Sequence, residues 1–389
     1  MAYTETSTEG WGSRLMSSIK GVLIGGLLFL VAFPLLFKNE GCAVTSYRAL
    51  TEGRGAVVEG KADTIDPALD KKLVHMTGEA KTEEILEDTE FNVKANAIAL
   101  RRAVAMYQYE EKSETKKKKN LGGSETTVTT YTYEKTWKDG LIDSSDFKDP
   151  DAPKNPTDMP FRDRGEEAKV VTFGAHTLSP GLISDIRNSV KLPVTKETLE
   201  AVPEDLRAKY PDLQVNSEEL YLGKDPANPA IGDMKISFTV VKPAEVSILS
   251  QQTGSSFEPF PTSVGEPVER LQMGNVSADA MFAAAEGEVA TRTWMIRGGG
   301  FFLMFMGLSM VFAPLSVAGD VVPFIGTMFR YGTALVAGVM AAFFSLVTIA
   351  IAWIVYRPLL GVILLAVAIG LVVLVKMMAG KKAPSAATA

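Results

Sequence analysis

Residues 21–37 read GVLIGGLLFLVAFPLLF and contain no charged side chain. A helix that crosses a membrane needs about 20 mostly apolar residues, so this segment predicts a crossing. Three more uncharged segments follow at residues 298–319, 331–356 and 358–375. They predict a membrane protein with one N-terminal and three C-terminal transmembrane helices. A purely soluble protein is excluded.

The charged residues are concentrated between the first and second uncharged segments. Residues 38–297 carry 33 Lys and Arg against 43 Asp and Glu, a net charge of −10, whereas the remainder of the chain carries +4. This distribution predicts one large extramembrane domain. Its acidic balance excludes nucleic acid as a partner, because binding phosphates requires a basic surface.

The sequence predicts seven segments in order. They are an amphipathic N-terminal segment (1–20), transmembrane helix 1 (21–37), an extramembrane domain (38–297) with a possible internal boundary near 149–160, transmembrane helices 2 (298–319), 3 (331–356) and 4 (358–378), and a disordered tail (379–389).

The first helix is predicted to be an uncleaved anchor. No small residues precede a cleavage position at the end of residues 21–37, as signal peptidase requires. Four crossings place both termini on one side, and the excess of basic residues near that side indicates that it is the cytoplasmic one.

The extramembrane domain is predicted to be α+β and dominated by sheet. Alternating residues at 96–111 and 126–137 predict a long hairpin with residues 116–123 at its tip. A second hairpin is predicted from residues 234–241 and 246–251, and short strands at residues 55–58 and 73–76.

Three helices are predicted in the same domain. One spans residues 179–191 with Ser179 as its N-cap, and one spans 195–210 with an interruption at Pro203. The third, residues 277–297, leads into the second crossing. Packing of its apolar side on the domain's own sheet is favoured over a coiled-coil seam, because the pattern covers fewer than three heptads.

No residue is assigned a catalytic, cofactor-binding or metal-ligating role, and no cofactor is predicted. The chain lacks the nucleotide-binding, hydrolase and zinc motifs that carry such chemistry. His75 and His176 are interpreted as structural, and the acidic residues around Glu83–Glu90 as a solvated helical face. The four lysines at the hairpin tip are interpreted as a solvated turn, with lipid headgroup binding as the alternative.

Ordered motifs along nearly the whole chain resemble the LUMA (transmembrane protein 43) family. They include Asn39-Glu-Gly-Cys-Ala-Val44, Leu100-Arg-Arg102, Ile142-Asp-Ser-Ser-Asp-Phe147, Gly232-Asp-Met-Lys-Ile-Ser-Phe238 and Tyr356-Arg-Pro-Leu359.

The resemblance implies an integral membrane protein that self-associates and binds other membrane or envelope proteins. It implies an endoplasmic reticulum and inner nuclear membrane location with a lumenal domain in a eukaryote. The alanine- and glycine-rich crossings keep a bacterial source open, and in a bacterium we expect the inner membrane with a periplasmic domain. The family offers no catalytic residues to carry over.

We therefore expect a non-enzymatic, multi-pass, homo-oligomeric membrane scaffold that contacts membrane lipid and organises protein partners. Two alternatives stay open, a channel or channel accessory subunit and a membrane-tethered lipid-modifying enzyme.

Overall fold

A computed structural model describes residues 2–358 of the chain. It divides into two units: residues 2–7, 49–117 and 127–284 form the first, and residues 8–48, 118–126 and 285–358 form the second. The fourth predicted crossing, except for its first residue, and the tail at 379–389 lie outside the described residues.

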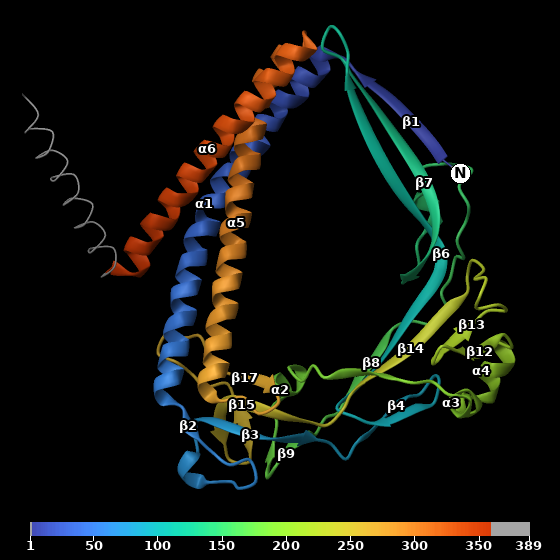
Figure 1. Cartoon of the computed structure of the whole chain (residues 1–389), viewed down its shortest axis with the longest axis vertical. Helices are drawn as coiled ribbons and strands as arrows, with labels where there is room; N and C mark the ends of the chain where they lie inside the picture. Colours follow the sequence, from blue (N-terminus) through green and yellow to red (C-terminus); the bar gives the residue numbers. More distant parts are fainter. Residues whose placement is uncertain (1, 359–389) are drawn as a thin grey trace, which may run out of the picture. The chain divides into compact units, whose positions relative to one another are not determined.

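Three long helices are side by side in Figure 1: α1 (Trp11–Ala56), α5 (Ala278–Gly319) and α6 (Pro323–Tyr356). Within the described residues these three are long and apolar enough to cross a membrane. The first three predicted crossings are thus confirmed as helices. Helix α1 continues far beyond residue 37, so the strand predicted at 55–58 is wrong. The helix ends at Ala56, and the short strand β2 (Val58–Glu59) follows it.

Glycines allow α1 and α5 to approach closely in the second unit. A Cβ added to Gly25 would lie 2.6 Å from the carbonyl oxygen of Gly307, and a Cβ on Gly307 would lie 2.6 Å from that of Gly25. Only glycine leaves room for such an approach. Helix α6 joins the pair through a buried cluster that includes Leu36, Met304 and Ala341.

The first unit is built from sheets, as predicted, with short helices between their strands. Its strands beyond β2 are β3 (Leu73–Lys81), β4 (Ile85–Asp88), β5 (Val93–Asn96), β6 (Ala99–Lys119), β7 (Glu125–Asp139), β8 (Arg164–Glu167), β9 (Thr172–Phe173), β10 (His176–Thr177), β11 (Ser189–Leu192), β12 (Leu213–Asn216), β13 (Glu219–Leu222), β14 (Met234–Val241), β15 (Ala244–Thr253), β16 (Ser256–Glu258) and β17 (Arg270–Met273).

The described strands form one eight-stranded, one seven-stranded and one two-stranded sheet. The first has the order β1-β7-β6-β14-β13-β12, with β11 beside β14 and β8 beside β6. It includes the N-terminal strand β1 (Ala2–Glu9), which the sequence did not predict. The second has the order β10-β9-β3-β15-β16, with β17 beside β15 and β2 beside β3, and β4-β5 is the third.

The long hairpin is confirmed as β6 and β7. The second predicted hairpin is wrong, although its two strands exist. Strand β14 pairs with β6 and β13 in the eight-stranded sheet, whereas β15 pairs with β3 and β17 in the seven-stranded sheet. Only Lys242 and Pro243 separate the strands. Proline removes a backbone donor at that point, which favours a change of sheet over a hairpin ladder.

The predicted helices of this unit are partly confirmed. Helix α2 (Pro180–Ser184) has the predicted Ser179 cap, whose hydroxyl accepts from the Leu182 amide, but it is only five residues long. The remainder of the predicted span contains β11. Pro203 divides the next span into α3 (Lys196–Ala201) and α4 (Glu204–Lys209), as predicted.

The start of α5 packs differently from the prediction. Phe282 is fully buried, and it lies against Gly53 and under the Arg54 guanidinium of α1. Farther along, the Glu286 carbonyl accepts from the Tyr47 hydroxyl, and Arg292 donates to the Ser46 hydroxyl. The favoured packing on a sheet is therefore wrong for most of this helix, because its partner is α1.

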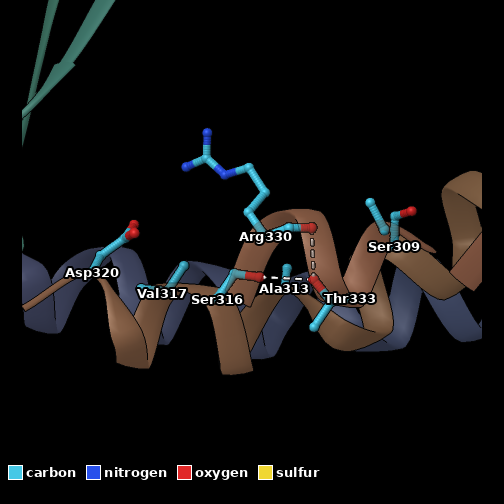
Figure 2. Close-up of a pocket in the computed structure, with 8 residues that line it drawn as sticks. Ser309, Ala313, Ser316, Val317, Asp320, Arg330 and Thr333 are labelled. Atoms are coloured by element: carbon cyan, nitrogen blue, oxygen red, sulfur yellow. Dashed lines mark hydrogen bonds between the residues drawn. The ribbon is translucent and has the colours of Figure 1, made fainter. Parts of the chain in front are cut away.

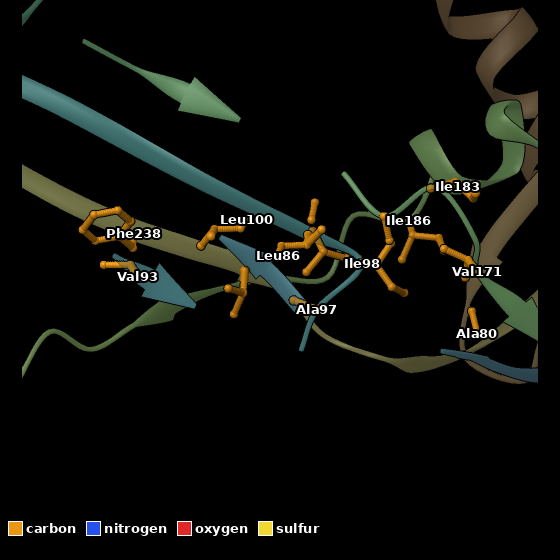
Figure 3. Packing of buried hydrophobic residues seen from close by; sticks show 14 of the residues in the cluster. Ala80, Leu86, Val93, Ala97, Ile98, Leu100, Val171, Ile183, Ile186 and Phe238 are labelled. Atoms are coloured by element: carbon orange, nitrogen blue, oxygen red, sulfur yellow. The ribbon is translucent and has the colours of Figure 1, made fainter. Parts of the chain in front are cut away.

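The apolar core of the first unit contains residues of the eight-stranded sheet, of the seven-stranded sheet and of the β4–β5 hairpin (Figure 3). Met234, Ile236 and Phe238 alternate along β14 and are fully buried. Val104 and Met106 of β6 stand opposite Ile236 and Met234 in register. This period of two is what a sheet with one packed face requires.

Candidate functional site

Buried charges gather at one end of the helices, in a group that we call the Asp320 cluster: Arg14, Lys119, Glu125 and Asp320. Asp320 lies in the turn between α5 and α6, and its side chain is 1% exposed. Arg14 Nη2 lies 2.7 Å from Asp320 Oδ2 and 3.3 Å from Glu125 Oε2. Lys119 Nζ binds the other Asp320 oxygen. The cluster thus joins α1, the α5–α6 turn and the tip of the β6–β7 hairpin.

The local sequence of the hairpin tip makes this contact possible. Gly123 adopts φ +81°, a left-handed conformation that favours glycine. A Cβ at this position would lie 2.5 Å from the Trp11 ring. The Gly123 carbonyl accepts from Arg14 Nη1, and the Trp11 indole donates to the Val317 carbonyl at 2.9 Å.

The electrostatics favour an ionised Asp320. Burial raises the pKa of this carboxyl, but hydrogen bonds and positive charge from Lys119 and Arg14 lower the pKa by more, so that it lies below its ordinary value. The charges of the four side chains add up to zero. A buried charge that is paired and hydrogen-bonded in this way is tolerated, whereas an unpaired one is costly.

A second group, the Glu40 cluster, consists of Glu40, Arg297 and Trp353, one residue from each long helix. Arg297 donates to both carboxylate oxygens of Glu40, at 2.7 and 2.8 Å. The Trp353 indole donates to Glu40 Oε2 at 2.8 Å. The Glu40 side chain is 2% exposed and that of Arg297 is 15% exposed. Two-point binding of a carboxylate by arginine is strong and fixes orientation.

The two clusters flank the uncharged part of α1. Arg14 and Glu40 are 26 residues apart in one helix, about 39 Å at 1.5 Å per residue. A bilayer is roughly 40 to 45 Å thick with its headgroups. The clusters therefore have the spacing of the two interfaces of one membrane.

A cavity of about 210 Å³ lies between α5 and α6 next to the Asp320 cluster. Its lining includes the hydroxyl-bearing residues Ser309, Ser316 and Thr333 and also Arg330 (Figure 2). Ser316 and Thr333 share a hydrogen bond of 3.0 Å. The Ser309 hydroxyl oxygen is buried and has no partner among the described residues.

The lysines at the hairpin tip are interpreted from the sequence as a solvated turn, and the structure agrees with this for Lys116 but not for Lys119. Lys116 is exposed and pairs with Glu114, as a solvated turn predicts. Lys119 is 13% exposed and bound to Asp320, so the solvated interpretation is wrong for this residue.

The two histidines have hydrogen-bonding partners in the sheets. His75 Nδ1 lies 2.7 Å from Glu59 Oε2, and its Nε2 lies 2.8 Å from the Val276 carbonyl oxygen. His176 Nδ1 lies 3.0 Å from the Ala62 carbonyl oxygen, and its ring packs on Phe257. Within residues 2–358, no group of three or more His, Cys, Asp or Glu side chains is placed to hold a metal ion.

The sequence predicts a helix for the acidic stretch from Glu83 to Glu90, and this prediction is wrong. The stretch contains strand β4, and Asp88 is buried in an ion pair of 2.9 Å with Arg102. Arg102 in turn stacks on Phe91. The acidic residues of this stretch therefore help to attach the β4–β5 hairpin to β6.

Comparison with known proteins agrees with this membrane architecture. The family model for Transmembrane protein 43 matches residues 106–358, well over half of the chain. The chain belongs to the Transmembrane protein 43 family.

Relatives in the family align along nearly their whole length. Transmembrane protein 43 of Homo sapiens is 29% identical over 375 residues, which cover 94% of this chain and 91% of the relative. The Transmembrane protein 43 homolog of Drosophila melanogaster is 29% identical over 350 residues, 88% of this chain and 90% of the relative. No solved structure matches the chain. Family membership and the three long helices identify an integral membrane protein.

Sequence reasoning missed both ion clusters, although a signal was present. Arg14 and Glu40 flank the first uncharged segment, and Arg297 and Asp320 flank the second. Consecutive crossings run antiparallel, so the start of one lies beside the end of the other. That arrangement places Arg14 with Asp320 and Glu40 with Arg297, each pair of opposite sign.

Proposed function

We propose that the protein is a non-enzymatic membrane scaffold that self-associates and organises membrane or envelope protein partners. The observation that carries self-association is an exposed face of α5 where that helix meets the uncharged segment. The face consists of Trp294, Met295, Gly298, Gly299 and Phe302. Residues 294, 298 and 302 are spaced by four, as are residues 295 and 299, so they lie on one side of the helix.

The glycines of this face pack against no other described residue. Glycine in a helix interior costs about 1 kcal/mol relative to alanine, so its presence calls for a reason. At Gly300 the reason is α1, because an added Cβ would lie 2.4 Å from Leu36. Around Gly298 and Gly299 no described residue lies within 4 Å of such a Cβ.

The large side chains beside the glycines are also uncovered. Trp294 and Met295 are each 66% exposed, and Phe302 is 57% exposed. A flat glycine surface between large apolar side chains suits the close approach of another helix. A second copy of α5, or a helix of a partner protein, would bury this face.

Self-association is tested by measuring the mass of the detergent-extracted protein by light scattering. We expect an oligomer for the natural chain and a smaller particle for Gly298→Leu/Gly299→Leu. Gly287→Leu is a matched control, because Gly287 is also exposed in α5 but lies outside the uncharged segment. A monomeric natural chain, or the same mass for all three proteins, would contradict the proposal.

In this proposal, the membrane in which the protein lies depends on the kind of organism that it comes from. In a bacterial source it is the inner membrane with a periplasmic domain, and in a eukaryotic source the endoplasmic reticulum and inner nuclear membrane with a lumenal domain.

A further inference from the structure

We propose that the cavity between α5 and α6 beside Arg330 binds the phosphate of one phospholipid. The inference does not depend on self-association or on a channel, because the site lies within one chain. It rests on the position of Arg330, the chemistry of the lining and an unpartnered hydroxyl.

Arg330 lies where phosphate groups of a bilayer are expected. It stands one residue before the uncharged segment 331–356, and the facing segment of α5 ends at Gly319, one residue before Asp320. Arginine at such a border reaches toward the headgroups while its helix enters the lipid. In Figure 2 the Arg330 side chain extends away from the helix pair on the same side as the Asp320 carboxylate.

The charge balance leaves Arg330 available for an anion. Asp320 also lines the cavity, but both of its oxygens are bound by Arg14 and Lys119. The guanidinium of Arg330 makes no hydrogen bond or ion pair with any described residue. An approaching phosphate therefore meets an uncompensated cation, which can donate two parallel hydrogen bonds to it.

The cavity continues from this cation into the membrane. Ser309 lies 11 residues before Asp320 in α5, about 16 Å along the helix. The lining between them combines hydroxyls with Ala313, Val317 and Ala334. A phospholipid presents the same sequence of groups: a phosphate at the interface, ester carbonyls below it, and then acyl chains.

The Ser309 hydroxyl offers the bound lipid a hydrogen-bond donor inside the cavity. Serine in a helix usually donates to a carbonyl of the preceding turn, but this buried oxygen has no partner among the described residues. A buried hydroxyl without a partner is unfavourable. An ester carbonyl of a bound lipid would accept its hydrogen bond.

A free phosphate ion has the same headgroup chemistry but does not explain the apolar depth of the cavity. The proposal is therefore committed to a lipid. Ser309 and the apolar lining have no function for a ligand that remains at the mouth.

The proposal is tested by native mass spectrometry of the full chain in detergent after lipid removal. Phosphatidylglycerol and diacylglycerol with identical acyl chains are added separately, since they differ in the phosphate headgroup. We expect one phosphatidylglycerol to be retained per chain under conditions that remove diacylglycerol. Equal retention of the two lipids would overturn the proposal.

Variants show whether Arg330 is responsible. Arg330→Gln should weaken retention roughly tenfold to a hundredfold, the range for a hydrogen bond to a charged group. Arg330→Lys should weaken it less, because the charge is kept. Lys20→Gln is a matched control, since Lys20 is an exposed cation directly before the first uncharged segment and should leave retention unchanged. Equal losses in Arg330→Gln and Lys20→Gln would assign the effect to general attraction and overturn the proposal.

Two further measurements separate the remaining outcomes. Ser309→Ala should weaken retention severalfold without lowering the melting temperature, because it removes a hydroxyl with no protein partner. Inorganic phosphate alone should leave the melting temperature of the natural chain unchanged. A rise that disappears in Arg330→Gln would identify a free phosphate site and overturn the lipid assignment.

Discussion

Both ion clusters pair buried charges of opposite sign, at opposite ends of the long helices, but they connect different parts of the chain. The Glu40 cluster joins one residue from each of α1, α5 and α6 and contains a two-point ion pair. The Asp320 cluster joins α1 to a turn and to a hairpin tip, and its carboxylate is divided between two cations. The first therefore stabilises the arrangement of the helices, and the second attaches the hairpin tip at residues 118–126 to them.

This comparison predicts that loss of the Glu40 cluster has the larger effect on global stability. Glu40→Gln leaves Arg297 largely buried without its carboxylate, and breaking a buried pair costs roughly 3 to 5 kcal/mol. We expect a clear fall in the melting temperature of the detergent-extracted protein. Glu167→Gln is the control, because its pair with Arg101 is exposed and worth about 1 kcal/mol or less. Similar melting temperatures for the two variants would remove the distinction between the clusters.

Loss of the Asp320 cluster should act locally. Asp320→Asn removes the charge that Arg14 and Lys119 share, but Arg14 keeps Glu125 as a partner. We expect a loss of roughly 1.5 to 3 kcal/mol, the range for hydrogen bonds to a charged group. Hydrogen exchange should rise at residues 118–126 and stay unchanged in β14. Faster exchange throughout the sheets would show that the cluster stabilises far more than the tip.

The indole of Trp353 allows a smaller perturbation of the Glu40 cluster. Trp353→Phe removes the N–H donor to Glu40 but leaves both hydrogen bonds from Arg297. We expect about 1.5 kcal/mol of destabilisation in thermal unfolding. A loss as large as that of Glu40→Gln would mean that tryptophan, and not arginine, is the main partner.

A change of pH should have the smallest effect near neutrality. The pKa of Asp320 is lowered, so its ionised form stabilises the folded state above the ordinary value of 3.8. That stabilisation disappears as the pH falls through the lowered pKa. The protection factor at the tip, which is the exchange rate corrected for the intrinsic pH dependence of amide exchange, should therefore be constant between about pH 8 and pH 5 and decrease only below about 3.8. Asp320→Asn should lack the acid transition, and a tip that is released near pH 6 would show that another group controls it.

The sequence predicted those elements whose pattern is local. Uncharged segments predicted the three described long helices, and alternation predicted β6 and β7. Pro203 and the Ser179 cap also act within a few residues and were interpreted correctly.

The errors concern partners that are distant in the sequence. Strands β14 and β15 were recognised, but the choice of sheet depends on β6 and β3, far away in the chain. The helical interpretation of Glu83–Glu90 failed because Asp88 is held by Arg102 of β6. Lys119 looked like a solvated lysine because its partner, Asp320, is 201 residues later.

The hairpin tip lies against the N-terminal end of α1. The double variant Trp11→Cys/Gly123→Cys, in a Cys42→Ser background, tests this contact most directly. A Cβ at Gly123 lies 3.2 Å from the Trp11 Cβ, close to the separation of about 3.5 to 4.5 Å across a disulfide. Gly12→Cys/Gly123→Cys is the control, because a Cβ at Gly12 meets no residue within 4 Å in the described part of the chain.

We predict that mild oxidation in native membranes links positions 11 and 123, and that the control pair links far less. Peptide mass spectrometry without reduction identifies the bond. If positions 11 and 123 stay reduced and react with an impermeant thiol reagent from opposite faces of the membrane, the contact does not exist. The Asp320 cluster would then be contradicted as a link between α1 and the hairpin tip.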